Sequence, residues 1–112
     1  MLSNNRPLNA VVLGRVTWPL LHRMSLMYPE KPAENDIKHM GRFLEAFGWL
    51  YPCSICATDF RDKMVESKPQ LHSRESFATW LCEQHNLVNK KLGKEEFKCS
   101  MRRLTFMYSS KS

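Results

Sequence analysis

Hydrophobic residues recur along this chain at intervals of three and four, which is the spacing of α-helices. In the segment from residue 10 to residue 28, Val12, Val16 and Leu20 form one stripe, and Leu13, Thr17, Leu21 and Met24 form the next. No segment alternates apolar and polar residues as a half-buried strand would. The pattern therefore predicts an all-α protein and a first helix that ends near Tyr28.

A second helix follows a break that contains two prolines. The segment YPEKPAEND ends the first helix, because proline lacks a backbone donor and restricts the residue before it. Asn35 or Asp36 then caps a helix predicted from about residue 37 to residue 50. Its apolar face consists of Ile37, Met40, Phe43, Leu44, Phe47 and Leu50.

Two longer segments and one short segment complete the predicted fold. Pro52 begins a third helix, which ends before the Lys-Pro pair at residues 68 and 69. Ser73 caps a fourth helix that closes at Gly93, and a last short helix starts near Lys94. We therefore expect a four-helix bundle with a short fifth helix, built as one domain from residues 1–112.

Composition changes this picture little. The chain has 112 residues, of which 43% are hydrophobic and 25% charged, as in ordinary globular proteins. Its net charge of +6 is spread along the chain, with small clusters at Lys90, Lys91 and Lys94 and at Arg102 and Arg103. A scattered excess is typical of a solvated basic surface, whereas a focused cluster would face a phosphate-bearing ligand. Nucleic-acid binding is a weaker alternative, because no recognition motif accompanies the charge.

The sequence predicts neither a secretory signal nor a membrane span. In the opening stretch MLSNNRPLNAVVLGRV the apolar run AVVL is too short for a signal peptide. No apolar run approaches the roughly 20 residues that cross a bilayer.

The motif YPCSIC carries the first candidate chemistry. Cys53 and Cys56 lie two residues apart at the predicted start of the third helix. A helix N-terminus stabilises a thiolate, which is the reactive form in thiol–disulfide exchange, and the second cysteine is close enough to resolve a mixed disulfide. The spacing favours a redox-active pair, with Tyr51 and Trp49 as an aromatic wall.

Zinc binding and inert buried thiols remain alternatives at this point. Cys82 and His85 repeat the two-residue spacing, so Cys53, Cys56, Cys82 and His85 would make a three-cysteine, one-histidine site in a zinc-stabilised interaction module. Both pairs are predicted to lie on helices, which is unusual for structural zinc, and Cys99 would be left over.

Two helical faces carry ring, amide and cationic side chains. In CEQHNLVNKKLGK, His85 and Asn89 share one face, and Asn86 lies on the neighbouring stripe with Lys90. Amides there would read a planar heterocycle such as adenine, with Lys91 and Lys94 near phosphates; the alternative is an exposed polar face.

The first helix carries a similar pattern in GRVTWPLLH. Trp18 and His22 lie four residues apart, and Arg15 precedes Trp18 by one turn. A tryptophan at this spacing is more often part of a core than of a cofactor site. The presence of two such faces and a CxxC motif in one small chain favours a cofactor.

Together, GRVTWPLLH, YPCSIC and CEQHNLVNKKLGKEEFKC resemble the Erv/ALR family of FAD-linked sulfhydryl oxidases over about residues 14–99. The resemblance implies a helical bundle that holds FAD in its mouth and forms a homodimer. Cys53 and Cys56 match the redox pair, with Cys53 open to substrate and Cys56 nearest the flavin. Cys82 and Cys99 match a structural disulfide. The residues that match the cofactor site are Gly14, Arg15, Trp18, His22, Tyr51, Cys82, His85, Asn86, Val88, Asn89, Lys91 and Lys94, with His85 stacked on adenine.

The resemblance also implies a reaction and its partners. Thiols of protein substrates, or of an import or folding oxidoreductase, would reduce the CxxC pair, which passes electrons to FAD and on to oxygen, giving hydrogen peroxide, or to cytochrome c. No metal, nucleic acid or membrane is expected. The family favours the mitochondrial intermembrane space, with the endoplasmic reticulum lumen or a viral setting as alternatives.

Two features depart from the family pattern. Many members carry a further cysteine pair in a terminal arm, but residues 1–52 and 100–112 contain no cysteine. We therefore expect this core to rely on a partner's thiols or to belong to a longer protein. The segment SMRRLTFMYSS also lacks the tryptophans that follow the last cysteine in the family, and Arg103 and Phe106 are expected to replace them.

Overall fold

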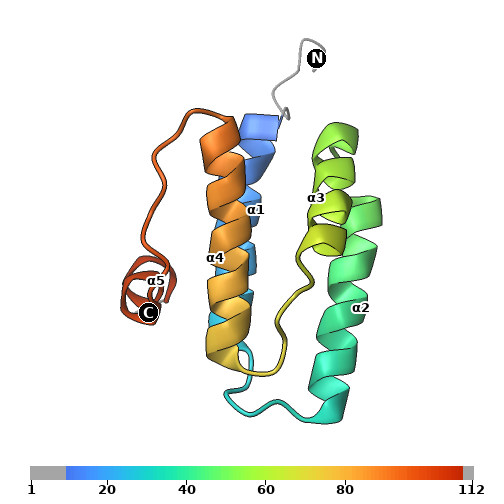
Figure 1. The fold of residues 1–112 in the computed structure, drawn as a ribbon, viewed down its shortest axis with the longest axis vertical. Helices are drawn as coiled ribbons and strands as arrows, with labels where there is room; N and C mark the ends of the chain where they lie inside the picture. The colour runs from blue at the N-terminus through green and yellow to red at the C-terminus, as the bar shows by residue number, and fades with distance from the viewer. Residues whose placement is uncertain (1–9, 110–112) are drawn as a thin grey trace.

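The computed structural model describes residues 10–109, which form five helices and no strand (Figure 1). The helices are α1 (Ala10–Met27), α2 (Glu34–Leu50), α3 (Ser54–Glu66), α4 (Arg74–Lys91) and α5 (Met101–Tyr108). The predicted all-α class, with four longer helices and a short fifth one, is confirmed. The first nine residues, where the sequence predicts no secretory signal, lie outside the described part of the chain.

The helices pack as two groups. Helix α1 packs on α4, α2 packs on α3, and α5 lies across α1 and α4 on the outer side of the bundle (Figure 1). The N-terminal ends of α1 and α3 and the C-terminal ends of α2 and α4 all lie at the same end of the bundle (Figure 1). The residues that carry the candidate chemistry are therefore gathered there.

The core joins the two groups below that end. Its buried residues are Leu21, Tyr28, Leu44, Phe77, Trp80 and Leu81, with Phe47 and Phe60 packed against them. Phe60 meets both Phe47 and Trp80 edge to face, with ring centroids 5.3 and 6.5 Å apart. Edge-to-face contacts fix the relative placement of aromatic rings, so this chain of rings aligns α2, α3 and α4.

A second apolar cluster holds α5 and the segment before it. Ala78, Cys82 and Leu104 are buried, and Leu26, Phe97, Cys99, Met101 and Tyr108 pack against them. The disulfide between Cys82 and Cys99 lies in this cluster, with Cα atoms 5.7 Å apart. It ties the extended segment 94–99 to α4.

The helix boundaries confirm some local predictions and correct others. Ser73 caps α4 as predicted, and its Oγ accepts a hydrogen bond from the Ser76 backbone N–H at 3.0 Å. The N-cap of α2 is Ala33 rather than Asn35 or Asp36; the Asp36 carboxylate instead accepts a bond from the Ala33 N–H at 2.8 Å.

Two further boundaries differ from the predictions. Pro52 lies outside α3, and Cys53 is the N-cap. No helix starts near Lys94, because residues 94–99 are extended and α5 begins only at Met101. Gly93, at the end of α4, adopts a left-handed φ of 74°, which turns the chain into that extended segment.

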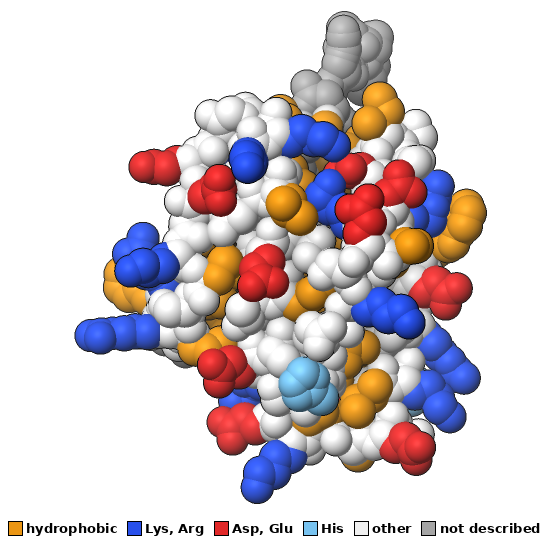
Figure 2. All heavy atoms as spheres, viewed as in Figure 1, with side chains coloured by type: hydrophobic (Ala, Val, Ile, Leu, Met, Phe, Trp, Pro, Cys, Tyr) orange, Lys and Arg blue, Asp and Glu red, His pale blue; other side chains and the backbone are white. Residues whose placement is uncertain are grey.

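The surface carries both signs of charge. On the face in Figure 2, Lys and Arg side chains lie among Asp and Glu side chains rather than in one basic field. Within the described residues, no helix is long and apolar enough to cross a membrane.

Candidate active site at the mouth of the bundle

The CxxC pair lies where α2 turns into α3. Cys53 and Cys56 form a disulfide, and their Cα atoms are 5.3 Å apart. Cys53 Sγ occupies the position of a capping oxygen and accepts a hydrogen bond from the Cys56 backbone N–H at 3.3 Å. The N-terminal dipole of α3 therefore acts on both sulfur atoms and would stabilise a thiolate formed on reduction.

The two sulfurs face different surroundings. Cys56 lines a cavity of about 390 Å³ between α1, α3, α4 and the end of α2, whereas Cys53 is not among its lining residues. Ile55, next to Cys56, is 82% exposed. One cysteine is thus available from outside the bundle, while the other faces its interior.

Most residues predicted to hold a cofactor meet in this cavity. Those lining it are Gly14, Arg15, Trp18, Tyr51, His85, Val88, Asn89, Lys91 and Lys94. Among the described residues, His22, Cys82 and Asn86 do not line it. The cavity therefore combines four segments that are far apart in the sequence.

Aromatic side chains form the inner wall. Trp18, Phe47, Tyr51 and Phe60 line the cavity, and the Phe47 and Tyr51 rings are 5.0 Å apart. The Tyr51 hydroxyl hydrogen-bonds Thr17 Oγ1 at 2.9 Å, which fixes α2 against α1. Sequence reasoning placed Phe47 in the core and overlooked Phe60, although Phe60 lies four residues after Cys56 and so shares its helical face.

Two histidines form a pair behind this wall. His22 Nε2 and His85 Nδ1 are 2.9 Å apart, so one of them carries the shared proton. The His85 ring stacks on Trp18 at 4.1 Å, and the His22 ring stacks on Tyr108 at 4.2 Å. His22 is 1% exposed, which explains why it supports the cavity through His85 rather than lining it.

Both histidines are held neutral. Burial, reinforced by His85, lowers the pKa of His22 to about 3. Burial, reinforced by Lys94, lowers the pKa of His85 to about 4. The rings are therefore uncharged at neutral pH, as stacking on an uncharged heterocycle favours.

A charged cluster borders the cavity between α3 and α4. Asp59 binds Lys63 at 2.8 Å and Lys91 at 3.0 Å. Burial acts to raise the pKa of Asp59, but the hydrogen bonds and charges of the two lysines outweigh it, so this pKa lies below its ordinary value. Together with Arg15 and Lys94, these lysines make the border of the cavity net positive.

Asn86 has a structural role rather than the predicted contact with adenine. Its Nδ2 donates to the Phe97 carbonyl at 2.7 Å, and its Oδ1 accepts from the Phe97 N–H at 3.0 Å. Both polar atoms of the side chain are therefore used to hold the extended segment 94–99. Cys82 is also removed from the cavity, because it is completely buried in its disulfide with Cys99.

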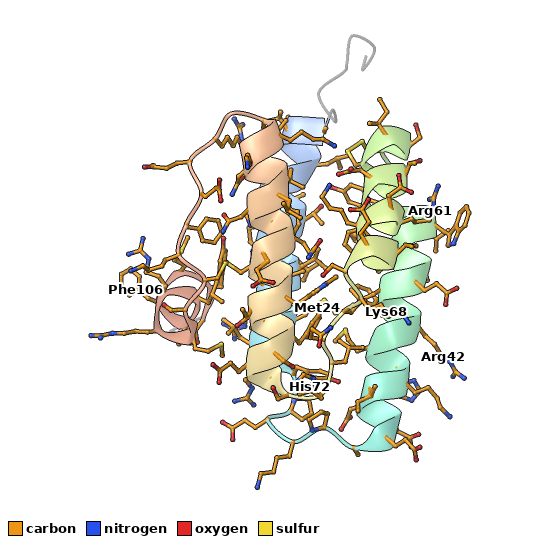
Figure 3. The ribbon with its side chains drawn as sticks, viewed as in Figure 1. Met24, Arg42, Arg61, Lys68, His72 and Phe106 are labelled. Carbon is orange, nitrogen blue, oxygen red and sulfur yellow. A yellow bond between two sulfur atoms is a disulfide. The ribbon has the colours of Figure 1, made fainter. Side chains whose placement is uncertain are left out.

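The C-terminal contact comes from a different residue than expected. Phe106 lies on the outer side of α5 and is 85% exposed, and Arg103 is also exposed (Figure 3). Neither residue lines the cavity, whereas Tyr108 does. The prediction for Arg103 and Phe106 was wrong because it took no account of how α5 is rotated against α1 and α4.

The alternative zinc site does not assemble. All four cysteines form disulfides, and Cys82 pairs with Cys99 rather than approaching Cys53. In the part of the chain that the structure describes, no three His, Cys, Asp or Glu side chains are grouped for a metal. A four-ligand centre would need both disulfides to be reduced and the helices to be rearranged.

The cavity fits a flavin dinucleotide in three respects. Its volume is typical of ligand pockets, its inner wall is aromatic, and its border carries lysines suited to a pyrophosphate. In addition, Gln84 lines the cavity and is 2% exposed, yet its Oε1 has no hydrogen-bond partner among the described residues. An unpaired buried acceptor is costly unless a ligand supplies the donor.

Comparison with known proteins places the chain among its relatives. The Erv1/Alr family model matches residues 15–109. The mitochondrial FAD-linked sulfhydryl oxidase ERV1 of Saccharomyces cerevisiae is 46% identical over 88 residues, which are 79% of this chain and 47% of that protein. The FAD-linked sulfhydryl oxidase ERV1 of Arabidopsis thaliana is 39% identical over 93 residues, 83% of this chain and 49% of that protein. The chain thus spans about half the length of the curated relatives it matches.

Solved structures agree in the fold. The crystal structure of the yeast Erv1 core superposes with a TM-score of 0.87 at 39% identity, covering 95% of this chain and 88% of that one. The FAD binding domain of Erv1 from Saccharomyces cerevisiae gives a TM-score of 0.84 at 40% identity, covering 90% of this chain and 94% of that one. The resemblance predicted from three sequence segments is thereby confirmed, and the chain belongs to the Erv1/Alr family.

Proposed function

We propose that this chain is a FAD-dependent thiol oxidase that makes disulfide bonds in protein substrates. The observation that carries the proposal is the Cys53–Cys56 disulfide, of which only Cys56 lines the aromatic cavity. The names of the relatives, which are FAD-linked sulfhydryl oxidases, support the same reaction. One sulfur for the substrate and one for the cofactor is the arrangement that such a reaction needs.

FAD would be held by residues from all sides of the cavity. The contacts proposed from the chain are Gly14, Arg15, Trp18, Tyr51, His85, Val88, Asn89, Lys91 and Lys94, with His22 and Asn86 supporting them from behind. When bound, FAD supplies a two-electron acceptor that passes its electrons to oxygen or to cytochrome c. The aromatic wall would exclude water from the flavin ring, and the lysines would neutralise the phosphates.

The chain's own sulfurs perform the exchange with the substrate. A substrate thiolate attacks Cys53 Sγ, the Cys53–Cys56 bond breaks, and Cys56 leaves as a thiolate stabilised by the N-terminus of α3. A second substrate thiolate then attacks the substrate sulfur of the mixed disulfide, which releases Cys53 and leaves the substrate oxidised. The pair has gained two electrons and two protons, and it returns to the disulfide by giving them up inside the cavity.

The partners and the compartment follow from the same proposal. Relatives named as mitochondrial support a mitochondrial location, and we place the chain in the intermembrane space, where thiol substrates or an import oxidoreductase would meet it. Exposed apolar side chains on α1, Val16 at 65% and Leu20 at 59%, support a homodimer. The 112 residues would act as one domain, in which α5 extends the core past residue 99.

The proposal is tested by the visible absorption spectrum of the purified protein, recorded before and after dithiothreitol is added in air. We expect a flavin band that bleaches and then recovers while oxygen is consumed. Separate assays for hydrogen peroxide and for reduced cytochrome c identify the acceptor. A protein that stays colourless after incubation with FAD, or a flavin band that dithiothreitol does not bleach, would contradict the proposal.

A further inference from the structure

Gln84 is a buried amide with no protein partner at the inner end of the cavity. Its side chain is 2% exposed, and its Oε1 accepts no hydrogen bond from any described residue. It projects from α4 one residue before His85 and lines the cavity. Neighbouring buried amides behave differently, because Asn86 uses both of its polar atoms to hold Phe97.

An unpaired acceptor in this position indicates a ligand. Almost all buried polar atoms in proteins are hydrogen-bonded, and leaving one unpaired costs stability. Leucine or methionine would fill the same space without that cost. The glutamine is therefore useful only when something in the cavity donates a hydrogen bond to Oε1.

The position of Gln84 selects one end of a dinucleotide. Lys91 lies seven residues later on the same face of α4, about 10 Å nearer the mouth. The phosphate-binding end of the cavity is thus two helical turns away from Gln84. At its inner end the cavity is bounded by Leu21, Phe47 and Phe60, which belong to or pack against the core.

The ring that must approach the redox pair occupies this inner end. Cys56 lines the cavity, and Phe60 lies one helical turn further in on the same face of α3. The isoalloxazine is a large planar ring with one polar edge, where an N3–H stands between two carbonyls. A primary amide is complementary to that edge, because its oxygen accepts from N–H and its NH₂ donates to a carbonyl.

We propose that Gln84 is a specificity-determining residue that reads the N3–H edge of the isoalloxazine, with Oε1 as the acceptor. This inference rests on the proposed function, since it requires a flavin in the cavity. It makes the apo protein less stable and the flavin-bound protein more selective. It also distinguishes the flavin ring from adenine as the group at the inner end.

The test compares four ligands by equilibrium titration of the flavin-free protein: FAD, N3-methyl-FAD, a FAD with an N6-modified adenine, and riboflavin. We expect N3-methyl-FAD to bind the unmodified protein at least about tenfold more weakly than FAD, because methylation removes the donor. The adenine-modified FAD should lose much less affinity through Gln84. Selectivity for the adenine-modified ligand instead would overturn the assignment.

The matched variants are Gln84→Leu and Gln70→Leu. Gln84→Leu should bind FAD about tenfold more weakly and should no longer distinguish FAD from N3-methyl-FAD. Its flavin-free form should unfold at a higher urea concentration, because the unpaired acceptor is gone. Gln70 is exposed and bonds only the Lys68 carbonyl, so Gln70→Leu should leave ligand affinity unchanged.

The outcomes separate the inference from the proposed function. If the protein binds neither FAD nor riboflavin, the proposed function itself fails. If FAD binds and the unmodified protein accepts N3-methyl-FAD equally well, only the role of Gln84 is overturned. The comparison of FAD with N3-methyl-FAD uses the unmodified protein, so it stands even where Gln84→Leu does not fold.

Discussion

The indole of Trp18 and the imidazole of His85 stack face to face, with ring centroids 4.1 Å apart and planes within 5° of parallel. One ring comes from α1 and the other from α4, so the pair joins the two helices at the edge of the cavity. His85 is bonded in turn to His22, which stacks on Tyr108. The aromatic wall of the site is thereby connected to α5.

Trp18→Leu should weaken both the apo fold and flavin binding. Loss of the stacked pair removes about 0.5–1.5 kcal/mol beyond the change in buried area, measured as the free energy of unfolding in urea. Flavin affinity should fall as well, because Trp18 lines the cavity. The matched control is Trp49→Leu: Trp49 is 66% exposed and contacts the Arg61 guanidinium outside the cavity, so flavin affinity should not change.

Cys56→Ser should abolish turnover while the flavin stays bound. The sulfur is needed for electron transfer, but the cavity wall comes from four other segments. Activity is measured as oxygen consumption with dithiothreitol, and flavin content from the visible spectrum. Cys53→Ser should also lose turnover with protein thiols. Loss of the flavin from Cys56→Ser, or turnover supported by Cys53 alone, would contradict the roles assigned to the two sulfurs.

Removal of the second disulfide should lower stability with little effect on chemistry. Cys82 and Cys99 are 17 residues apart, and closing a loop of this size is worth roughly 3 kcal/mol in the chain-entropy model. The double variant Cys82→Ala, Cys99→Ala should therefore unfold at a lower urea concentration. At low temperature it should keep its flavin and its activity. Unchanged stability would show that the disulfide is not a structural one.

Asn86→Ala should release the segment that precedes α5. Two hydrogen bonds to Phe97 are lost, and the free energy of unfolding should fall by about 1–3 kcal/mol. Hydrogen exchange of residues 94–99 should become faster. The exposed Asn35→Ala serves as the control and should change neither measurement. A large loss of flavin affinity with unchanged stability would instead restore the adenine contact predicted from the sequence.

Stability should depend on pH through the histidine pair. The pKa values of His22 and His85 are lowered to about 3 and about 4 in the native state, against about 6.5 in the unfolded chain. The unfolded state then binds more protons between these values, so stability present above pH 6.5 is lost as the pH falls toward 4.

The measurement is urea unfolding at a series of pH values. His22 alone contributes a slope approaching about 1.4 kcal/mol per pH unit in the acidic part of this range. His22→Gln should flatten the curve. His39→Gln, at an exposed position, should leave it unchanged.

Much of the fold was predictable because its signals are local. Apolar spacing gave the four long helices, and Ser73 caps α4 through a bond to a residue only three positions away. The extended segment 94–99 was missed because Asn86 and Phe97 hold it, and a bond between side chain and distant backbone leaves no local pattern. The N-cap of α2 was misassigned within a run of several competent capping residues.

The site was predictable where a motif carried it and unpredictable where packing decides. Trp18, Tyr51 and Lys91 lie in the cavity, as the family resemblance implied. Tyr108 rather than Phe106 reaches it, because the rotation of α5 depends on the cluster beneath that helix. Gln84 gives no sequence signal at all: a glutamine in a helix is ordinary, and only its burial without a partner is informative.

The burial of Cys82 has a consequence for how many electrons the folded chain can store. Its disulfide with Cys99 is sealed beneath α5, with Cys82 completely excluded from solvent. Incoming thiols therefore find a single reducible sulfur pair, which accepts two electrons and then must be emptied before another substrate can react. The folded chain works as a relay with one place in it and keeps no reserve of oxidising equivalents.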